Sequence, residues 1–192
     1  AEQKRLRSCR VAVGGLGGVG GSHTLTLARL GIGAFTITDL DTFDWANMNR
    51  QAGAMASTIG RPKLEVMAEQ VRDITPTVQL ELMPNGINED NIDHFLKDAD
   101  IYVDSLDIFS LNIRRKVFQR CWELGIPAVT AAPMGMGTST LAFVPGHMSF
   151  EDYFALDGYS FEDQIIKFIV GVSPSMIQRH YLLNRESVNI FK

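Results

Sequence analysis

A glycine-rich turn between a strand-like and a helix-like segment constrains the fold of this chain most strongly. The glycine run at residues 15–20 follows the apolar stretch Arg10–Gly14 and precedes a helix expected over residues 19–30. A second strand-like run, Ala34–Thr38, ends at Asp39, about 20 residues after the glycines, where nucleotide-binding folds place a ribose-binding acid. This order of strand, turn, helix, strand and acid predicts a nucleotide-binding βαβ unit.

Each part of this unit has a physical use. Glycines let the backbone approach a phosphate closely, and the N-terminus of the following helix presents free N–H groups and a partial positive charge. The same glycines also serve a tight turn that packs a helix on a strand. The pattern fits dehydrogenases, flavoproteins and ATP users alike, so the turn alone leaves the nucleotide open.

Bulk composition narrows the class of protein. The 192 residues are 45% hydrophobic and 21% charged, which suits one globular core, and the net charge of −4 argues against nucleic-acid binding. Apolar runs fall short of the ~20 residues of a membrane helix. Cys9 and Cys121 are the only cysteines, so a disulfide framework is excluded and a cytoplasmic setting is expected. The chain opens at Ala1 without Met, enters its first strand almost at once, and is expected to be a piece of a longer protein.

Strand and helix patterns alternate along residues 10–144. Helices are expected near residues 61–75, 88–96 and 110–124, and strands at 78–82, 101–103, 126–130 and 138–144. Gly31 and Gly125 are expected to end helices, and Ser110 to cap one. This alternation predicts an α/β fold of the Rossmann-like, doubly wound kind, a mostly parallel sheet with helices on both faces.

The texture of the chain changes after Gly146. Ser149 and Ser160 each precede an acid in a first helical turn and are expected to be N-caps. A further helix is expected at residues 176–183. We therefore divide the chain into a nucleotide-binding domain at 1–146 and a helical extension at 147–192, which is expected to be truncated and part of the same domain.

Charged residues are expected to converge on the glycine turn, because ligands in such sheets lie beyond the carboxyl ends of the strands. Asp41 follows the second strand, Arg50 and Lys63 lie on and after the long connection from residue 39 to 60, and Asp107 follows the strand at 101–103. Taken singly, Arg50 and Lys63 read as solvated cations and Asp107 as an Asx turn. Together they favour a triphosphate with Mg²⁺ over a dinucleotide, because two cations neutralise phosphate oxygens and a carboxylate holds the metal.

The motifs from residue 10 to residue 144 resemble the ThiF/MoeB family of adenylating enzymes, which are related to the ubiquitin-activating enzymes. The carrying segments are GLGGVG at 15–20, DLD at 39–41, NMNRQ at 47–51, GRPK at 60–63 and DSLD at 104–107. The combination of NxxRQ with GxPK is specific, since dehydrogenases do not carry it. The resemblance implies ATP-dependent adenylation of a carboxylate, such as the C-terminus of a small β-grasp or sulfur-carrier protein, with release of pyrophosphate and in a homodimer.

The resemblance also implies residue roles. Gly17 and Gly18 would lie against the phosphates, Asp39 would bind the ribose, and Asn47, Arg50 and Lys63 would hold the phosphates. Asp107 would position Mg²⁺ and the reacting centre. The predicted nucleotide-binding set is Gly15, Gly17, Gly18, Gly20, Asp39, Asp41, Asn47, Arg50, Gln51 and Lys63; the predicted catalytic set is Arg50, Lys63 and Asp107, with Asp107 as the metal ligand.

Several positions depart from the family pattern. Ile108 stands where many members have Asn, paired zinc-binding cysteines and a catalytic cysteine are missing, and Arg5 and Arg7 are poor substitutes for an N-terminal arginine that reaches the partner subunit. Cys121 is expected to pack in the core. An NAD- or FAD-binding oxidoreductase domain and a catalytically silent ThiF-like scaffold remain alternatives, and the acyl substrate and any later thiol step are left open.

Overall fold

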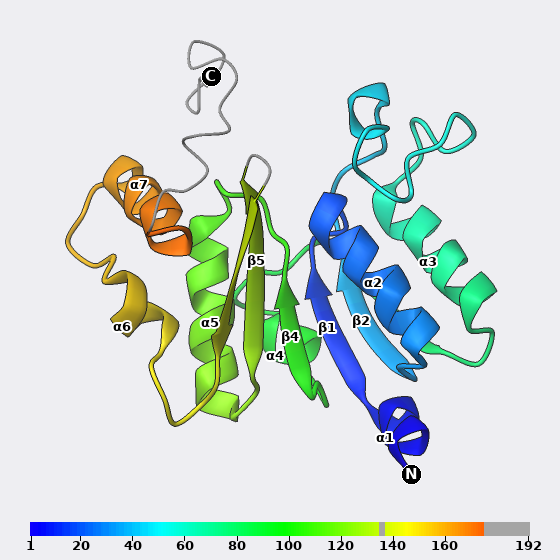
Figure 1. Cartoon of the computed structure of the whole chain (residues 1–192), viewed down its shortest axis with the longest axis horizontal. Coiled ribbons are helices and arrows are strands. Elements are labelled where there is room, and N and C mark those ends of the chain that lie inside the picture. The colour runs from blue at the N-terminus through cyan, green and yellow to red at the C-terminus, as the bar shows by residue number, and fades with distance from the viewer. Residues whose placement is uncertain (135–136, 175–192) are drawn as a thin grey trace.

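The computed structural model describes residues 1–134 and 137–174 and contains a six-stranded mixed sheet (Figure 1). Its strands are β1 (Arg10–Gly14), β2 (Ala34–Thr38), β3 (Gln79–Leu82), β4 (Ile101–Asp104), β5 (Ala128–Met134) and β6 (Gly137–Phe143). They lie in the order β3-β2-β1-β4-β5-β6. All neighbouring pairs are parallel except β5 and β6, which are antiparallel. The predicted Rossmann-like α/β fold is confirmed.

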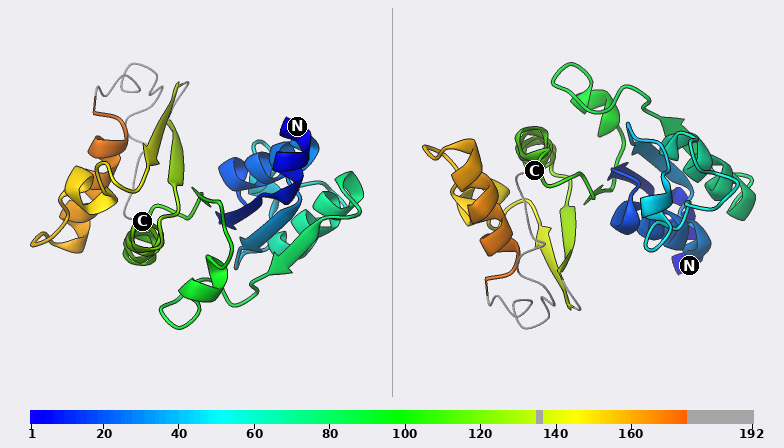
Figure 2. Two further views of the ribbon diagram at one scale, coloured as in Figure 1. Left: turned by 90° about the horizontal axis from the view of Figure 1, so that it is seen from below. Right: turned by 90° about the horizontal axis from the view of Figure 1, so that it is seen from above.

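Helices cover both faces of the sheet (Figure 2). They are α1 (Glu2–Ser8), α2 (Gly18–Leu30), α3 (Lys63–Ile74), α4 (Ile92–Phe95), α5 (Leu111–Leu124), α6 (Phe150–Phe154) and α7 (Phe161–Val172), with a short 3-10 helix at Trp45–Asn47. Helices α2 and α3 pack against each other, whereas α5 contacts α4 and α6. None of the helices in the described residues combines the length and apolar character that a bilayer crossing requires.

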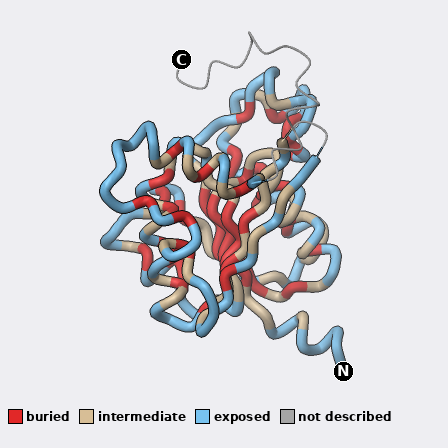
Figure 3. The backbone as a smooth tube through the Cα atoms, turned by 60° about the vertical axis from the view of Figure 1, so that its left-hand side comes forward, coloured by how far each residue is buried: buried red, intermediate tan, exposed pale blue. Residues whose placement is uncertain are grey.

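Alternation along the strands divides the core into two apolar clusters, one on each face of the sheet. Figure 3 shows that the middle of the sheet is the buried part of the fold. Val11 and Val13 of β1 join the cluster beneath α2 and α3, whereas Ala12 between them joins the cluster beneath α5. Tyr102 and Val103 of β4 divide in the same way. This division follows because successive side chains of a strand point to opposite faces of the sheet.

Of the helix ends and caps predicted from the sequence, some are confirmed and one is not. Gly31 and Gly125 end α2 and α5 in the left-handed conformation, with φ of 94° and 74°. Ser149 and Ser160 cap α6 and α7 through their side chains, as expected. Ser110 stands at the N-cap of α5, but its side chain makes no capping bond.

Some element bounds also differ from the expectation. Strand β1 begins at Arg10 as expected, but helix α1, which the sequence did not predict, precedes it. The helix expected at 88–96 spans only Ile92–Phe95, and the strand expected at 126–130 is β5, which begins at Ala128. The helix expected at 176–183 lies outside the described residues.

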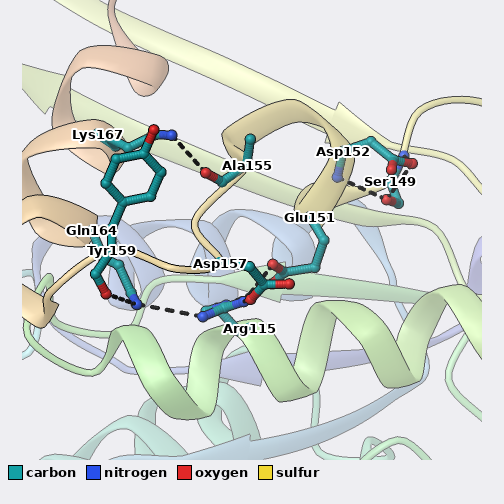
Figure 4. Close-up of polar contacts among 9 residues, drawn as sticks. All are labelled: Arg115, Ser149, Glu151, Asp152, Ala155, Asp157, Tyr159, Gln164 and Lys167. Atoms are coloured by element: carbon teal, nitrogen blue, oxygen red, sulfur yellow. Dashed lines mark hydrogen bonds and ion pairs between the residues drawn. The ribbon is translucent and has the colours of Figure 1, made fainter.

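The segment after Gly146 attaches to α5 through both apolar and polar contacts. Figure 4 shows the polar ones, around Arg115. Phe150 of α6 stacks on Phe118 of α5 with ring centroids 4.5 Å apart. The Arg115 guanidinium of α5 donates to Glu151 from Nε over 2.7 Å, and it also bonds Asp157. Arg115 Nη1 also donates to Gln164 Oε1 of α7 over 3.4 Å. Residues of α7 line the same cavity as the end of β5.

Candidate functional site

A single cavity of about 650 Å³ lies at the carboxyl ends of the parallel strands. It brings together all of the predicted site residues except Gly20. The predicted residues that line it are Gly15, Gly17, Gly18, Asp39, Asp41, Asn47, Arg50, Gln51, Lys63 and Asp107. These residues follow β1, β2 and β4, or lie at the start of α2, on the long connection and at the start of α3. The fold thus gathers residues from Gly15 to Asp107 at one place.

The glycine turn is shaped by very close backbone packing. Gly15 has φ of +88°, and its N–H donates to the Thr38 carbonyl over 3.0 Å. A Cβ on Gly20 would lie 1.9 Å from the Gly15 carbonyl oxygen, so Gly20 is required for the shape of the turn and not as part of the cavity wall. Gly17 is different, because a Cβ at this position would lie 3.8 Å from its nearest neighbour, Gln51 Nε2.

Helix α2 begins where the turn meets the cavity. Gly17 is its N-cap, no side chain caps it, and its first turn carries no acidic residue within the described chain. The orphan N–H groups of this first turn, together with the helix dipole, favour an anion. The arrangement is a ready site for a phosphate group.

Asp39 holds the glycine turn to the end of β2. Its Oδ2 accepts the Leu16 N–H over 2.6 Å, and its Oδ1 accepts the Asp41 N–H over 2.8 Å. Each carboxylate oxygen retains a second lone pair, so Asp39 can also accept hydroxyl groups from a ligand. Asp39, which the sequence predicts to bind the ribose, therefore also holds the glycine turn in place.

Lys63 is buried, with a side chain only 7% exposed, although the sequence alone allowed a solvated cation. Its Nζ donates to Asp41 Oδ2 over 2.9 Å, and its backbone N–H bonds the Asp41 carbonyl over 2.9 Å. The Asp41 side chain is 72% exposed. An isolated bridge between Thr42 and Pro62 and a bond from the Phe43 N–H to the Arg61 carbonyl also close this loop. The loop closure thus brings a cation at the start of α3 back to the glycine turn.

The connection supplies three more polar side chains. Asn47 Oδ1 accepts the Asp44 N–H over 3.0 Å, in a capping box that shapes the 3-10 helix. Arg50 is exposed and donates from Nη1 to the Ala46 carbonyl over 2.9 Å. Gln51 is 7% exposed, yet its Oε1 has no hydrogen-bond partner among the described residues. An unpartnered buried acceptor at a cavity wall indicates a missing donor, such as a ligand or a water.

The end of β4 carries two acids with different surroundings. Asp107 is exposed, and its Oδ1 accepts the Phe109 N–H over 2.9 Å in an Asx turn. Asp104 is buried, with a side-chain exposure of 0%, and its Oδ2 accepts from Arg114 Nε over 2.8 Å. Only Asp107 is therefore placed to meet a ligand with a free carboxylate.

Sequence reasoning missed Arg114, which shapes the loop between these two acids. Its side chain is 4% exposed and also donates to the Asp107 carbonyl over 3.2 Å and to the Leu106 carbonyl. The guanidinium lies over the Phe168 ring of α7, 4.8 Å from the centroid. Arg114 lies on the otherwise apolar buried face of the amphipathic helix α5, and this helical spacing is the one signal in the sequence that could have identified it.

Neither cysteine is among the residues that line the cavity. Cys121 is buried in the core beneath α5, as predicted, and burial raises the pKa of its thiol to about 12. Cys9 donates from Sγ to the Arg5 carbonyl over 3.2 Å. Over the described residues, no three His, Cys, Asp or Glu side chains gather as a metal site.

Comparison with known proteins places this geometry in a family. The ThiF family model matches residues 1–188, so the chain belongs to the ThiF family. It is 39% identical over 132 residues to a tRNA threonylcarbamoyladenosine dehydratase of Haemophilus influenzae, covering 68% of this chain and 50% of that protein. It is 27% identical over 143 residues to the sulfur carrier protein ThiS adenylyltransferase of Escherichia coli, covering 74% and 56%.

Solved structures agree with this assignment. The E. coli tRNA N6-threonylcarbamoyladenosine dehydratase TcdA in complex with ATP matches with a TM-score of 0.66 and 31% identity, covering 70% of this chain and 56% of that chain. E. coli MccB with ATP matches with a TM-score of 0.70 and 25% identity, covering 87% and 48%. This chain thus spans about half the length of the curated relatives it matches.

Proposed function

We propose that this ThiF-family chain binds ATP with Mg²⁺ in the cavity and adenylates a carboxylate, releasing pyrophosphate. The observation that carries the proposal is the meeting of an uncapped helix N-terminus, two cations and one free carboxylate at a single cavity. A dinucleotide site uses the first of these features and one acid. The relatives with bound ATP, TcdA and MccB, support the same choice of nucleotide.

Different residues of the cavity would bind different parts of ATP. Gly17 and Gly18 lie at the start of α2, where backbone N–H groups would receive a phosphate, and Asp39 would accept the ribose hydroxyls. Arg50 and Lys63 would neutralise phosphate oxygens. Lys63 is already held by Asp41 on the outer side of the cavity, so ATP would meet a positioned ammonium group.

Mg²⁺ fits the donor set of the cavity. Asp107 Oδ2 makes none of the hydrogen bonds found in the described residues, and Mg²⁺ commonly takes one or two carboxylates together with phosphate oxygens and several waters. Asp107 would therefore hold the ion with the phosphates. The ion would supply charge neutralisation at the phosphates during the reaction.

The chemistry needs positioning more than a protein nucleophile. A carboxylate oxygen of the substrate forms a bond to the α-phosphorus, and the bond from that phosphorus to the bridging oxygen of pyrophosphate breaks. The products are an acyl-adenylate and pyrophosphate, whose growing negative charge Arg50, Lys63 and the N-terminus of α2 would stabilise. The buried, protonated thiol of Cys121 takes no part.

The cellular setting of the activity belongs to the same proposal. The ThiS adenylyltransferase among the relatives suggests a small carrier protein as one source of the carboxylate, and we also propose a homodimer in the cytoplasm. Residues 1–146 would form the adenylation domain, and 147–192 an extension of it.

A thermal-shift experiment followed by pyrophosphate exchange tests the function. At a concentration about 100 times the dissociation constant, ATP·Mg²⁺ should stabilise the folded chain by about 2.7 kcal/mol, a shift of several degrees in Tm, and NAD should do so far less. Carboxylate-dependent exchange of labelled pyrophosphate into ATP would then demonstrate the adenylation step. A larger shift with NAD would favour an oxidoreductase domain, and binding of neither nucleotide would favour a silent scaffold.

A further inference from the structure

The cavity extends beyond the residues that the nucleotide would use. Along the sheet edge, its lining follows the strand order: Asp39 after β2, Gly15 after β1, Asp107 after β4, and then Thr130–Met134 at the end of β5 (Figure 1). The β5 end is therefore the part of the cavity farthest from the expected ribose site. Helix α7 covers this end, because it packs on β6 and contributes to the lining.

The β5 end differs in chemistry from the rest of the lining. Its wall consists mostly of aliphatic and aromatic side chains contributed by three elements. They are Ala131, Ala132, Pro133 and Met134 from β5, Ile113 from α5, and Phe168, Ile169 and Val172 from α7. A pocket with such a wall favours an apolar group over a solvated one.

Within the described part of the chain, this end offers no free cation to a substrate. Among the described residues, the charged side chains here are Asp104, Asp107 and Arg114. Arg114 and Asp104 form a buried ion pair, and Phe168 covers the guanidinium. The end thus holds no unpaired cation within the described chain, and a second carboxylate on a substrate would be buried there without a partner.

The direction of attack connects this pocket to the reaction. An in-line displacement places the attacking oxygen opposite the leaving oxygen. Arg50 and Lys63, which would hold the departing pyrophosphate, come from the connection between β2 and α3, on the other side of Asp107 from β5. The carboxylate would accordingly reach the α-phosphorus from the β5 side, with the rest of the acid in the apolar end.

We infer that this chain activates a carboxylic acid whose acyl group is compact and apolar, held between β5 and α7. The inference rests on the proposed adenylation. It assigns the choice of acyl group to α7, through Ile169, Phe168 and Val172, and leaves nucleotide binding to the glycine turn and the connection.

Pyrophosphate exchange in the full-length protein tests this with three probe acids: hexanoate, the dicarboxylate adipate of the same length, and glycylglycine. Hexanoate should have a KM at least about tenfold below those of the other two, since each tenfold corresponds to 1.4 kcal/mol. In Ile169→Lys, the KM for adipate divided by the KM for hexanoate should fall by about tenfold, because the substitution places a cation beside the second carboxylate. Ile166→Lys is the matched control: it lies on the same helix, is 49% exposed and does not line the cavity.

The outcomes separate this inference from the function beneath it. Preferred exchange with glycylglycine, or equal effects of both lysine variants, would overturn the apolar acyl site while adenylation stands. If none of the acids supports exchange, adenylation of these acids fails. Calorimetric titration of hexanoate in the presence of AMP then decides the pocket by itself: saturable binding weakened in Ile169→Lys but not in Ile166→Lys supports it, and absence of binding overturns it.

Discussion

The two sides of the cavity are built in different ways. Between the ends of β1 and β2, the wall next to α2 is mainly backbone: a tight glycine turn, a helix N-terminus and one carboxylate, Asp39, that ties them together. On the side of β4 and β5, the wall depends on side chains that meet across the fold, with Arg114 bonded to Asp104 and covered by Phe168. A backbone-built wall is sensitive to added atoms, whereas a wall built from side chains is sensitive to lost partners.

The largest expected effect breaks the side-chain wall. Asp104→Asn leaves Arg114 buried without its carboxylate, so the free energy of unfolding should fall by about 3–5 kcal/mol. Urea unfolding monitored by circular dichroism measures this. Asp157→Asn is the comparison variant, because Asp157 is 90% exposed and its ion pair should contribute at most about 1 kcal/mol. Equal losses in the two variants would contradict the importance of the buried pair.

The second expected effect concerns the free acid of the same loop. Asp107→Ala should lower the rate of adenylation by on the order of a hundredfold, about 3 kcal/mol, because charge on the departing pyrophosphate would lose its metal-binding carboxylate. Affinity for ATP should fall much less. Single-turnover kinetics with direct ATP titration separate the two quantities. Near-normal turnover would show that the Asx turn is its whole role.

The third prediction applies to the backbone wall. Gly17→Ala adds a Cβ that the free protein can accommodate, so its melting temperature should stay close to that of the unchanged protein while ATP affinity falls by on the order of tenfold or more. Gly20→Ala should instead lower the melting temperature, because its Cβ would overlap the Gly15 carbonyl. Melting curves and calorimetric titration of both variants measure this. Unchanged ATP affinity in Gly17→Ala would contradict the proposal that a phosphate binds at the start of α2.

The smallest expected effect lies away from both walls. Cys121→Ala should cost roughly 1 kcal/mol of stability and leave adenylation unchanged. Because burial raises the pKa of Cys121 to about 12, the folded state favours the neutral thiol. The contribution of the neutral thiol to folding stability is fully present below the pKa of the thiol in the unfolded chain, and it is lost as pH rises toward 12. Iodoacetamide should label Cys121 at pH 8 only in the unfolded chain, as mass spectrometry would show, and fast labelling in the folded state would contradict this.

Local sequence was enough to predict the backbone wall. Gly15, Gly20 and Asp39 act through contacts within a few residues or through a βαβ unit whose order is visible along the chain. The same holds for the Ser149 and Ser160 caps. Ser110 shows the limit of this reasoning, since it has the right position but its hydroxyl makes no capping bond.

Long-range contacts explain what the sequence did not predict. Arg114 is one of several cations on the amphipathic helix α5, and it differs from the others because it contacts Asp104, ten residues away, and Phe168 of α7. The apolar wall has the same origin, because Ile113 of α5 and Ile169 of α7 are far from β5 in the sequence and reach its end only in the folded chain. Helix α1 was missed because its seven residues bury no side chain and so carry no apolar stripe.

The double attachment of Asp39 has a consequence for the timing of binding. Because this carboxylate already bonds the Leu16 amide and the start of the connection, the glycine turn has its binding shape before any ligand arrives. An incoming nucleotide would then incur little ordering entropy in the turn. The association rate should be governed by diffusion and charge, and variants far from the turn should alter residence time instead.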